Sequence, residues 1–292
     1  AAELDEVRKQ LSDETLEKSK RDICFIDESA LSYSEAEDKI GSGGMGSVFR
    51  AKWELRNGPV KVAIKKLHTN NAKPGAAKIM VDELKREALT LSKLGFHTNI
   101  VQFYGMGSDP NKPCFVTEFV DGETLLDLLY DIETSMPSDR LAPVDKCHIA
   151  VGVADGLQHI HDSGLVHLDL KPANVMVHKD GQVPKLIDVG ISRAAEALGS
   201  TAKGTWFYMG PEQIDATHNK YAATWDVYAF GVLLNEMVTK RPPWFNMEKK
   251  RFDPGPQVVV KVKEGDRPRP VAKGHVMGHL VTACWSRYSN KR

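Results

Sequence analysis

The chain has 292 residues, of which 41% are hydrophobic and 27% charged, as is ordinary for globular proteins. Its 39 basic and 39 acidic side chains balance, so no overall field favours nucleic acid as a partner. No stretch approaches the roughly 18 apolar residues of a membrane span, and the polar, acidic amino end is unlike a signal peptide. The four cysteines lack paired spacing and predict free thiols rather than disulfides or a zinc site. We therefore expect a cytoplasmic protein, with a nuclear location as the alternative.

Charge is distributed unevenly along the chain. Residues 1–39 carry 12 acidic and 6 basic side chains, whereas residues 240–292 carry 4 acidic and 13 basic ones. A solvated helical face explains the basic end best, and a docking patch for an acidic partner is the weaker alternative. Apolar residues at helical spacing predict a short amphipathic helix within residues 1–22. We assign residues 1–35 to an N-terminal helical or linker extension, and a regulatory partner would bind through its helix.

A glycine-rich turn between β-branched stretches predicts a β-hairpin in residues 36–67. Its glycines, in Gly41-Ser42-Gly43-Gly44-Met45-Gly46, allow backbone amides to close over phosphates without Cβ clashes. On this motif alone, a structural hairpin tip is as good an explanation as a nucleotide loop. A dinucleotide-binding fold would place an acidic residue about twenty positions later, where this chain has Lys65 and Lys66.

The next expected element is an amphipathic helix over residues 77–94. Its apolar stripe includes Leu84 and Leu91, and Glu87 falls on the same stripe. A carboxylate that faces the core needs a cation, and Lys65, at the end of an apolar strand, is the obvious candidate. The alternative is a surface ion pair worth less than about 1 kcal/mol.

Further elements follow in chain order. Two strands are expected at residues 100–104 and 114–119, a long buried helix around residues 149–160, and another apolar helix at residues 226–238. The pattern predicts a β-rich small lobe followed by a larger helical lobe, joined near residues 118–122.

Three residues in two later segments are the most informative. Asp169 and Asn174 stand five residues apart, and Asp188 follows Asn174 by fourteen. Such a set can supply a base for a hydroxyl and hard oxygen ligands for divalent cations. Each residue alone is more often a turn residue, but we put the chance of coincidence for their joint spacing below roughly one in a hundred.

With the glycine turn and Lys65, these segments resemble a eukaryotic protein kinase over about residues 26–292. The resemblance implies an α+β, bilobal protein-kinase fold, with a small antiparallel β-sheet lobe carrying one helix and a larger, mainly helical lobe. The kinase N-lobe would cover residues 36–118 and the C-lobe residues 119–292. Because the family has one more helix after Arg292, we expect a truncated piece.

The resemblance also implies an activity, ATP- and Mg²⁺-dependent transfer of the γ-phosphate to a serine or threonine hydroxyl of a protein. Asp169 would orient the hydroxyl and accept its proton, and Lys171 would neutralise the transferring phosphoryl group. Lys65, paired with Glu87, would hold the α- and β-phosphates.

Other roles follow from the same resemblance. Asn174 and Asp188 would hold Mg²⁺, and Thr205 would hydrogen-bond near Asp169 and Lys171. The residues implied to surround the nucleotide come from the glycine turn, the neighbouring strands and the connection between the lobes: Ile40, Gly41, Ser42, Gly43, Gly44, Met45, Gly46, Ser47, Val48, Ala63, Lys65, Thr117, Glu118, Phe119, Val120 and Met176. Without the resemblance, we would assign the apolar residues of this set to the ordinary hydrophobic core.

The segments 171–172 and 204–205 resemble serine/threonine kinases rather than tyrosine kinases. Residues 26–31 resemble the tyrosine-kinase-like group of serine/threonine kinases. The segment 204–212 resembles a peptide-substrate platform, which disfavours a kinase acting on a small molecule. Asp226 would anchor the backbone of the catalytic loop.

Two positions depart from the family pattern. Leu168 replaces the arginine that usually grips a phosphorylated activation loop, and Val189 replaces a phenylalanine. Control through phosphate on Ser192, Ser200 or Thr201 is therefore in doubt, and solvated loop hydroxyls explain these side chains better. The departures keep a pseudokinase, acting as a nucleotide-binding scaffold or allosteric regulator, as the alternative, although neither removes a catalytic group.

Overall fold

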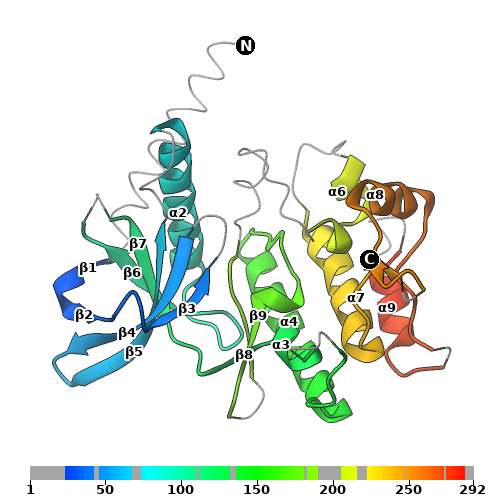
Figure 1. Ribbon diagram of the computed structural model, residues 1–292, viewed down its shortest axis with the longest axis horizontal. Helices are drawn as coiled ribbons and strands as arrows, with labels where there is room; N and C mark the ends of the chain where they lie inside the picture. Colours follow the sequence, from blue (N-terminus) through cyan, green and yellow to red (C-terminus); the bar gives the residue numbers. More distant parts are fainter. Residues whose placement is uncertain are drawn as a thin grey trace. The chain divides into compact units, whose positions relative to one another are not determined.

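The computed structural model describes residues 24–42, 46–67, 74–109, 112–131, 136–180, 183–189, 205–215, 222–246, 248–272 and 274–286. The chain divides into two compact units, which are described one at a time (Figure 1). Unit 1 comprises Ala1–Phe96 and Gln102–Phe119, and unit 2 comprises His97–Val101 and Val120–Arg292. The helix predicted within residues 1–22 lies outside the described residues.

Unit 1 is built on a seven-stranded sheet in the order β1-β6-β7-β5-β4-β2, with β3 paired to β4. All its pairs are antiparallel except β1 with β6. One long helix, α2, packs on β5, β6 and β7. The elements are β1 Phe25–Ile26, η1 Glu28–Ala30, β2 Leu31–Ser32, β3 Lys39–Ser42, β4 Gly46–Leu55, β5 Gly58–Leu67, α2 Pro74–Leu94, β6 Phe103–Gly107 and β7 Cys114–Glu118.

The predicted hairpin is confirmed, because β3 and β4 pair on either side of the glycine turn. Two predicted boundaries were wrong. The helix α2 begins at Pro74 rather than at residue 77. Proline lacks a backbone N–H, but in the first turn of a helix that group has no partner within the helix in any case. The strand expected from Ile100 begins at Phe103, because Ile100 bridges Leu186 in unit 2 instead.

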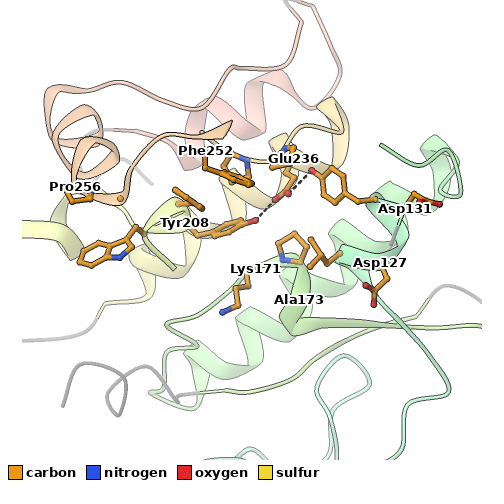
Figure 2. A pocket seen from close by; sticks show the side chains of 16 residues that line it. Asp127, Asp131, Lys171, Ala173, Tyr208, Glu236, Phe252 and Pro256 are labelled. Atoms are coloured by element: carbon orange, nitrogen blue, oxygen red, sulfur yellow. Dashed lines mark hydrogen bonds between the residues drawn. The ribbon is translucent and has the colours of Figure 1, made fainter. Parts of the chain in front are cut away.

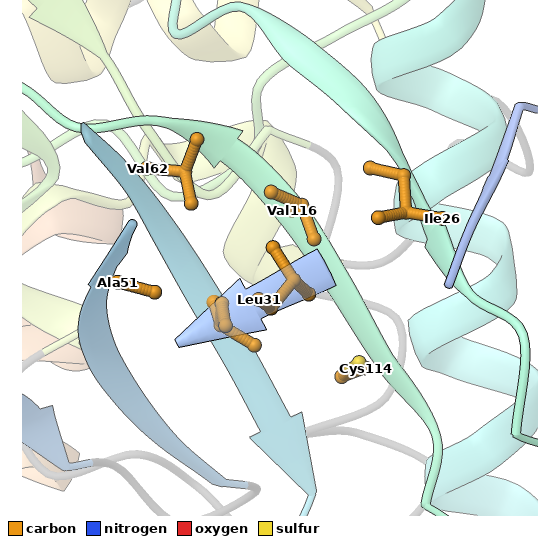
Figure 3. Close-up of a cluster of buried hydrophobic side chains, with 7 residues drawn as sticks. Ile26, Leu31, Ala51, Val62, Cys114 and Val116 are labelled. Atoms are coloured by element: carbon orange, nitrogen blue, oxygen red, sulfur yellow. The ribbon is translucent and has the colours of Figure 1, made fainter. Parts of the chain in front are cut away.

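The segment before the glycine turn completes the core of unit 1 (Figure 3). Ile26 and Leu31 pack into one buried apolar cluster with side chains from β4, β5 and β7. β1 comes close to β6 because Gly105 has no side chain; a Cβ there would lie 2.4 Å from the carbonyl oxygen of Cys24. The residues ahead of the glycine turn therefore belong to the folded unit.

We expect Ile26→Ala to lower the free energy of unfolding by about 2–4 kcal/mol, because a buried aliphatic side chain would leave a cavity. The side chain of Ile26 is 3% exposed, whereas Phe25, its neighbour in β1, is 60% exposed. Phe25→Ala is the matched control and should change stability by no more than about 0.5 kcal/mol. Urea unfolding measures both; equal effects of the two variants would contradict the packing of β1 into the core.

Unit 2 is mainly helical and is organised around α7, which packs against α4 and α9. A three-stranded sheet, β10-β9-β8, lies beside α4. The elements are β8 Gly122–Thr124, α3 Leu125–Leu129, α4 Pro143–Asp162, η2 Pro172–Asn174, β9 Val175–His178, β10 Pro184–Leu186, η3 Thr205–Tyr208, α6 Pro211–Asp215, α7 Ala223–Thr239, β11 Phe245–Asn246, β12 Arg251–Phe252, α8 Gly255–Glu264 and α9 Gly278–Cys284.

The two predicted apolar helices are confirmed within α4 and α7. Most of α7 is buried, including Tyr228 and Leu233, so unit 2 surrounds this helix. α4 ends before Gly164, which adopts the left-handed conformation (φ 71°) typical of the residue after a helix. Across the described part of the chain, no helix combines the length and apolarity needed to cross a membrane.

Candidate active site

Three predicted catalytic side chains of unit 2 lie together. Lys171 Nζ donates to Asp169 Oδ2 at 2.6 Å, and Asn174 Nδ2 donates to the same oxygen at 2.9 Å. Asn174 Nδ2 also donates to the backbone oxygen of Asp169 at 2.8 Å. Within the described residues, no hydrogen bond reaches Asp169 Oδ1. Because the side chain of Asp169 is 20% exposed, that oxygen can accept a proton from a hydroxyl of another molecule.

The backbone of this loop is held by Asp226, which extends from the buried helix α7. Its carboxylate accepts hydrogen bonds from the backbone nitrogens of His167 (2.7 Å) and Leu168 (2.8 Å). The imidazole of His161 lies 2.8 Å from the same carboxylate. The predicted anchor is therefore confirmed. It holds Leu168 at φ 71°, a left-handed conformation that costs roughly 1–2 kcal/mol for a residue with a side chain.

The two residues predicted to hold a metal flank neighbouring strands. β9 and β10 pair with Val175 opposite Leu186, so Asn174 just precedes one strand and Asp188 follows shortly after the other. The backbone nitrogen of Ile187 donates to the backbone oxygen of Asn174 at 3.1 Å, which fastens the two segments there. Asp188 has φ 57°, which Asp tolerates better than most residues.

The donor set formed by Asn174 and Asp188 suits one class of metal. Within the described ranges, no group of three or more His, Cys, Asp or Glu side chains is arranged to hold a metal. Mg²⁺ commonly takes only one or two protein carboxylates and completes its shell with water and substrate phosphates. One carboxylate and one amide oxygen therefore fit a hard divalent cation that completes its shell in this way, and not a dedicated protein cage.

The predicted ion pair of unit 1 is confirmed. Lys65 Nζ lies 3.0 Å from both carboxylate oxygens of Glu87. Their side chains are only 16% and 5% exposed, so the alternative of a solvated surface pair is wrong. The ring of Phe115, in the adjacent strand β7, lies 5.5 Å from Lys65 Nζ. The contacts with Glu87 and with the Phe115 ring together hold the side chain of Lys65 in one orientation.

The glycine turn is described only at its two flanks. Gly41 and Ser42 end β3, and Gly46 begins β4, whereas residues 43–45 lie outside the described residues. A Cβ on Gly46 would lie 2.1 Å from the carbonyl oxygen of Lys66, so only glycine fits there. In the sheet, Val48 is the partner of Lys65, which places the strand after the turn beside the lysine.

The residues predicted to surround the adenine fall in both units. In unit 1, Ala63 and Thr117 are cross-strand partners, and Ile40 is 50% exposed. Val120 and Met176 belong to unit 2. Ser47 lies in β4, Glu118 ends β7, and Phe119 follows β7 directly. The assembly of all these side chains around one nucleotide stays a prediction.

Some predicted residues lie outside the described part of the chain. They are Ser192, Ser200 and Thr201, together with the side chain of Thr205. Val189 is described and is fully buried.

One buried polar cluster at the cavity wall was missed by the sequence analysis. Glu236, on α7, is 1% exposed and accepts hydrogen bonds from the hydroxyls of Tyr130 (2.9 Å) and Tyr208 (2.6 Å). These residues line a cavity of about 930 Å³, which Lys171 also lines (Figure 2). The sequence did carry a signal for this cluster, because Glu236 falls within an apolar helix. A buried carboxylate needs polar partners, which is the reasoning that paired Glu87 with Lys65.

Burial raises the pKa of Glu236 to about 7, against the opposing effect of the two tyrosine hydroxyls. Burial, together with the nearby carboxylate, also raises the pKa of Tyr208 and of Tyr130. Both phenols therefore stay protonated and continue to donate to Glu236. The cluster ties α3, η3 and α7 together along one wall of the cavity.

Glu236 should make stability fall as pH rises from about 4.5 to about 7. In that window the folded state binds a proton that the unfolded state has released, because the pKa is higher in the folded state. We expect Glu236→Gln to remove this contribution, so that the wild type loses stability relative to the variant from pH 5 to pH 7. Urea unfolding across this range measures the difference, with Asp180→Asn, whose side chain is 78% exposed, as control. Parallel curves for wild type and Glu236→Gln would contradict the assignment.

Comparison with known proteins agrees with the geometry. The sequence matches the family model described as "Protein kinase domain" over residues 34–292. A probable LIM domain-containing serine/threonine-protein kinase of Dictyostelium discoideum is 32% identical over 260 residues, covering 87% of this chain and 24% of that protein. The serine/threonine-protein kinase pkn2 of Myxococcus xanthus is 38% identical over 215 residues, covering 70% of this chain and 24% of that protein.

A third relative is the mitogen-activated protein kinase kinase kinase 7 of Bos taurus. It is 28% identical over 263 residues, covering 88% of this chain and 41% of that protein. The chain thus spans between about a quarter and two-fifths of the length of these relatives. The predicted resemblance and the α+β kinase fold are confirmed. The chain therefore belongs to the protein kinase family.

Proposed function

We propose that this chain is a serine/threonine protein kinase that transfers the γ-phosphate of ATP to a protein hydroxyl with the help of Mg²⁺. The observation that carries the proposal is the Asp169 carboxylate, held by Lys171 and Asn174 on a loop anchored to Asp226. The serine/threonine specificity is supported by the names of two of the relatives, the Dictyostelium discoideum and Myxococcus xanthus kinases.

Each residue has a defined part in the proposed reaction. Asp169 orients the acceptor hydroxyl and takes its proton, and Lys171 offsets negative charge on the transferring group. Lys65, directed by Glu87, holds the phosphates of the donor. Bound Mg²⁺, held by Asn174 and Asp188, would neutralise phosphate charge. Catalysis then comes from positioning and electrostatic stabilisation, without a covalent enzyme intermediate.

The proposal extends to the cellular location of the protein and to a regulatory partner. Cys24, Cys114, Cys147 and Cys284, all among the described residues, form no disulfide, which is compatible with a reducing compartment. A cytoplasmic location is proposed on this basis. A regulatory partner is proposed to bind through the N-terminal helix expected within residues 1–22.

The test is the identity of the phosphorylated residue. The protein is incubated with Mg²⁺, γ-labelled ATP and a basic protein substrate, and the labelled amino acids are separated after acid hydrolysis. We expect phosphoserine and phosphothreonine. Label on tyrosine alone would overturn the serine/threonine assignment, and ATP binding without any transfer would favour a pseudokinase.

A further inference from the structure

Unit 1 has a cavity of its own, with walls from β2, the segment after it, β4 and β5 (Figure 1). β2 stands at the end of the sheet order, so the cavity lies at an edge of the sheet. Its volume is about 490 Å³. A pocket of this size holds ligands much larger than a single ion. The lining residues are Ser32, Tyr33, Ser34, Asp38, Arg50, Ala51, Lys52 and Lys61.

Two lysines face each other across strands in this cavity. Lys52 of β4 and Lys61 of β5 are direct cross-strand partners, which places their Cβ atoms about 4.5–5.5 Å apart on one face of the sheet. Like charges in this arrangement repel and destabilise the sheet. Within the described residues, neither lysine side chain has a hydrogen bond or an ion pair. An anion bound between the two ammonium groups would remove the repulsion.

The other two charged groups of the wall are paired with each other. Arg50, on the same face of β4 as Lys52, donates through Nη2 to Asp38 Oδ1 at 3.0 Å. The backbone nitrogen of Ser34 donates to Asp38 Oδ2, also at 3.0 Å. The three cations of the wall against its one carboxylate leave a net charge of +2. Glu54, the next residue on this face of β4, does not line the cavity and has no ion pair among the described residues.

Two hydroxyls complete a set of hydrogen-bond donors. Ser32 is the cross-strand partner of Lys52 on β2 and therefore lies on the same face of the sheet. The hydroxyl of Ser34 belongs to the same wall. A phosphate monoester carries a charge of about −1.5 to −2 at pH 7 and three acceptor oxygens, whereas one carboxylate carries a single charge. The net charge and the donors of the wall therefore match a phosphate better than a carboxylate.

We propose that this cavity binds a phosphorylated side chain of a protein segment, with its phosphate between Lys52 and Lys61 and in reach of the Ser32 hydroxyl. The preference for phosphate stands on the cavity alone. The protein carrier rests on the proposed function, because a serine/threonine kinase produces phosphoserine and phosphothreonine. Lys61 precedes Lys65 by four residues on β5, about 13 Å along the strand. The site is therefore distinct from the lysine that would hold the phosphates of ATP, and it would retain a phosphorylated protein at unit 1.

The test is the binding of a fluorescein-labelled peptide of glycine and alanine that carries one phosphoserine, measured by fluorescence anisotropy. A non-hydrolysable ATP analogue is present at saturation, so that the phosphate of the peptide cannot occupy the nucleotide site. We expect this peptide to bind about 10-fold more tightly than its serine counterpart, as two exposed ion pairs would contribute. A glutamate counterpart should bind more weakly than the phosphoserine peptide. Equal binding of the phosphoserine peptide and either counterpart would overturn the proposal.

Variants of the two lysines assign the preference to this cavity. Lys52→Gln with Lys61→Gln should remove the preference for phosphoserine over serine. Because the double variant also removes the cross-strand repulsion, it should unfold at the same urea concentration as the wild type or at a higher one. Lys249→Gln, at an exposed lysine of unit 2, is the matched control and should keep the preference. A preference that survives in the double variant would place the phosphate elsewhere and overturn the site.

Inorganic phosphate distinguishes a phosphate on a protein from the free ion. Added at the Kd of the phosphoserine peptide, it should displace little of the peptide, because it lacks the contacts of the carrier with the rest of the cavity. Displacement of half of the bound peptide at that concentration would overturn the protein carrier.

The binding measurement needs no phosphate transfer, so the two proposals fail separately. An enzyme that phosphorylates serine but does not prefer the phosphoserine peptide would overturn this site and leave the proposed function standing. A preference for the phosphoserine peptide without any transfer would overturn the proposed function and leave the phosphate site standing.

Discussion

An Asp169→Asn variant is expected to transfer phosphate about 1,000-fold more slowly than the wild type. Asn keeps the shape of the side chain, and its single carbonyl oxygen can still accept the hydrogen bonds from Lys171 and Asn174. What the amide cannot do is take the proton of the acceptor hydroxyl, a contribution worth typically 100- to 10,000-fold. The loss should therefore appear in kcat, with little change in stability.

Steady-state transfer to a basic protein measures this effect, and thermal unfolding and ATP binding show that the variant is folded. Asp180→Asn makes the same chemical change at an exposed carboxylate and should retain wild-type kcat. A kcat for Asp169→Asn within a few-fold of the wild type would show that another group accepts the proton.

Asp226→Ala is expected to cause the second large effect, on stability and activity together. Removal of its carboxylate leaves the buried backbone N–H of His167 and that of Leu168 without acceptors. We expect a loss of about 3–5 kcal/mol in the free energy of unfolding, from two unsatisfied donors and a lost contact with His161. Leu168 then loses what holds it in the left-handed conformation, so Asp169 loses its position and transfer should fall to background.

Urea unfolding and phosphate transfer on the same preparations test this pair of effects. Asp226→Asn keeps one carbonyl oxygen and should fall between the wild type and Asp226→Ala in stability. Asp180→Ala removes an exposed carboxylate and should change stability by no more than about 0.5 kcal/mol. Full activity in a folded Asp226→Ala protein would contradict the anchoring role.

The parts of the site that follow from spacing and charge could be predicted from the sequence. Glu87 was paired with Lys65 because a carboxylate on the apolar face of a helix needs a cation in any fold. Asp169 and Asn174 share one short loop, so their contact is local and depends little on tertiary structure.

The parts that depend on partners distant in sequence could not be predicted in the same way. The hydroxyls of Tyr130 and Tyr208 reach Glu236 from 106 and 28 residues away, and nothing local in the sequence pairs them. β6 begins at Phe103, where its pairing with β7 begins, and not at the predicted Ile100. Ile100 forms an isolated bridge with Leu186 instead. Apolar periodicity alone does not choose between two such partners.

The rate of Mg²⁺-dependent phosphate transfer from ATP to serine and threonine of a basic protein tests the kinase assignment most directly. The wild type is measured in parallel with Asp169→Asn and Asp188→Asn. We expect transfer by the wild type that requires Mg²⁺ and falls close to background in both variants, while all three proteins remain folded. Wild-type protein that binds ATP but transfers no phosphate, or a rate within a few-fold of the wild type in both variants, would contradict the assignment.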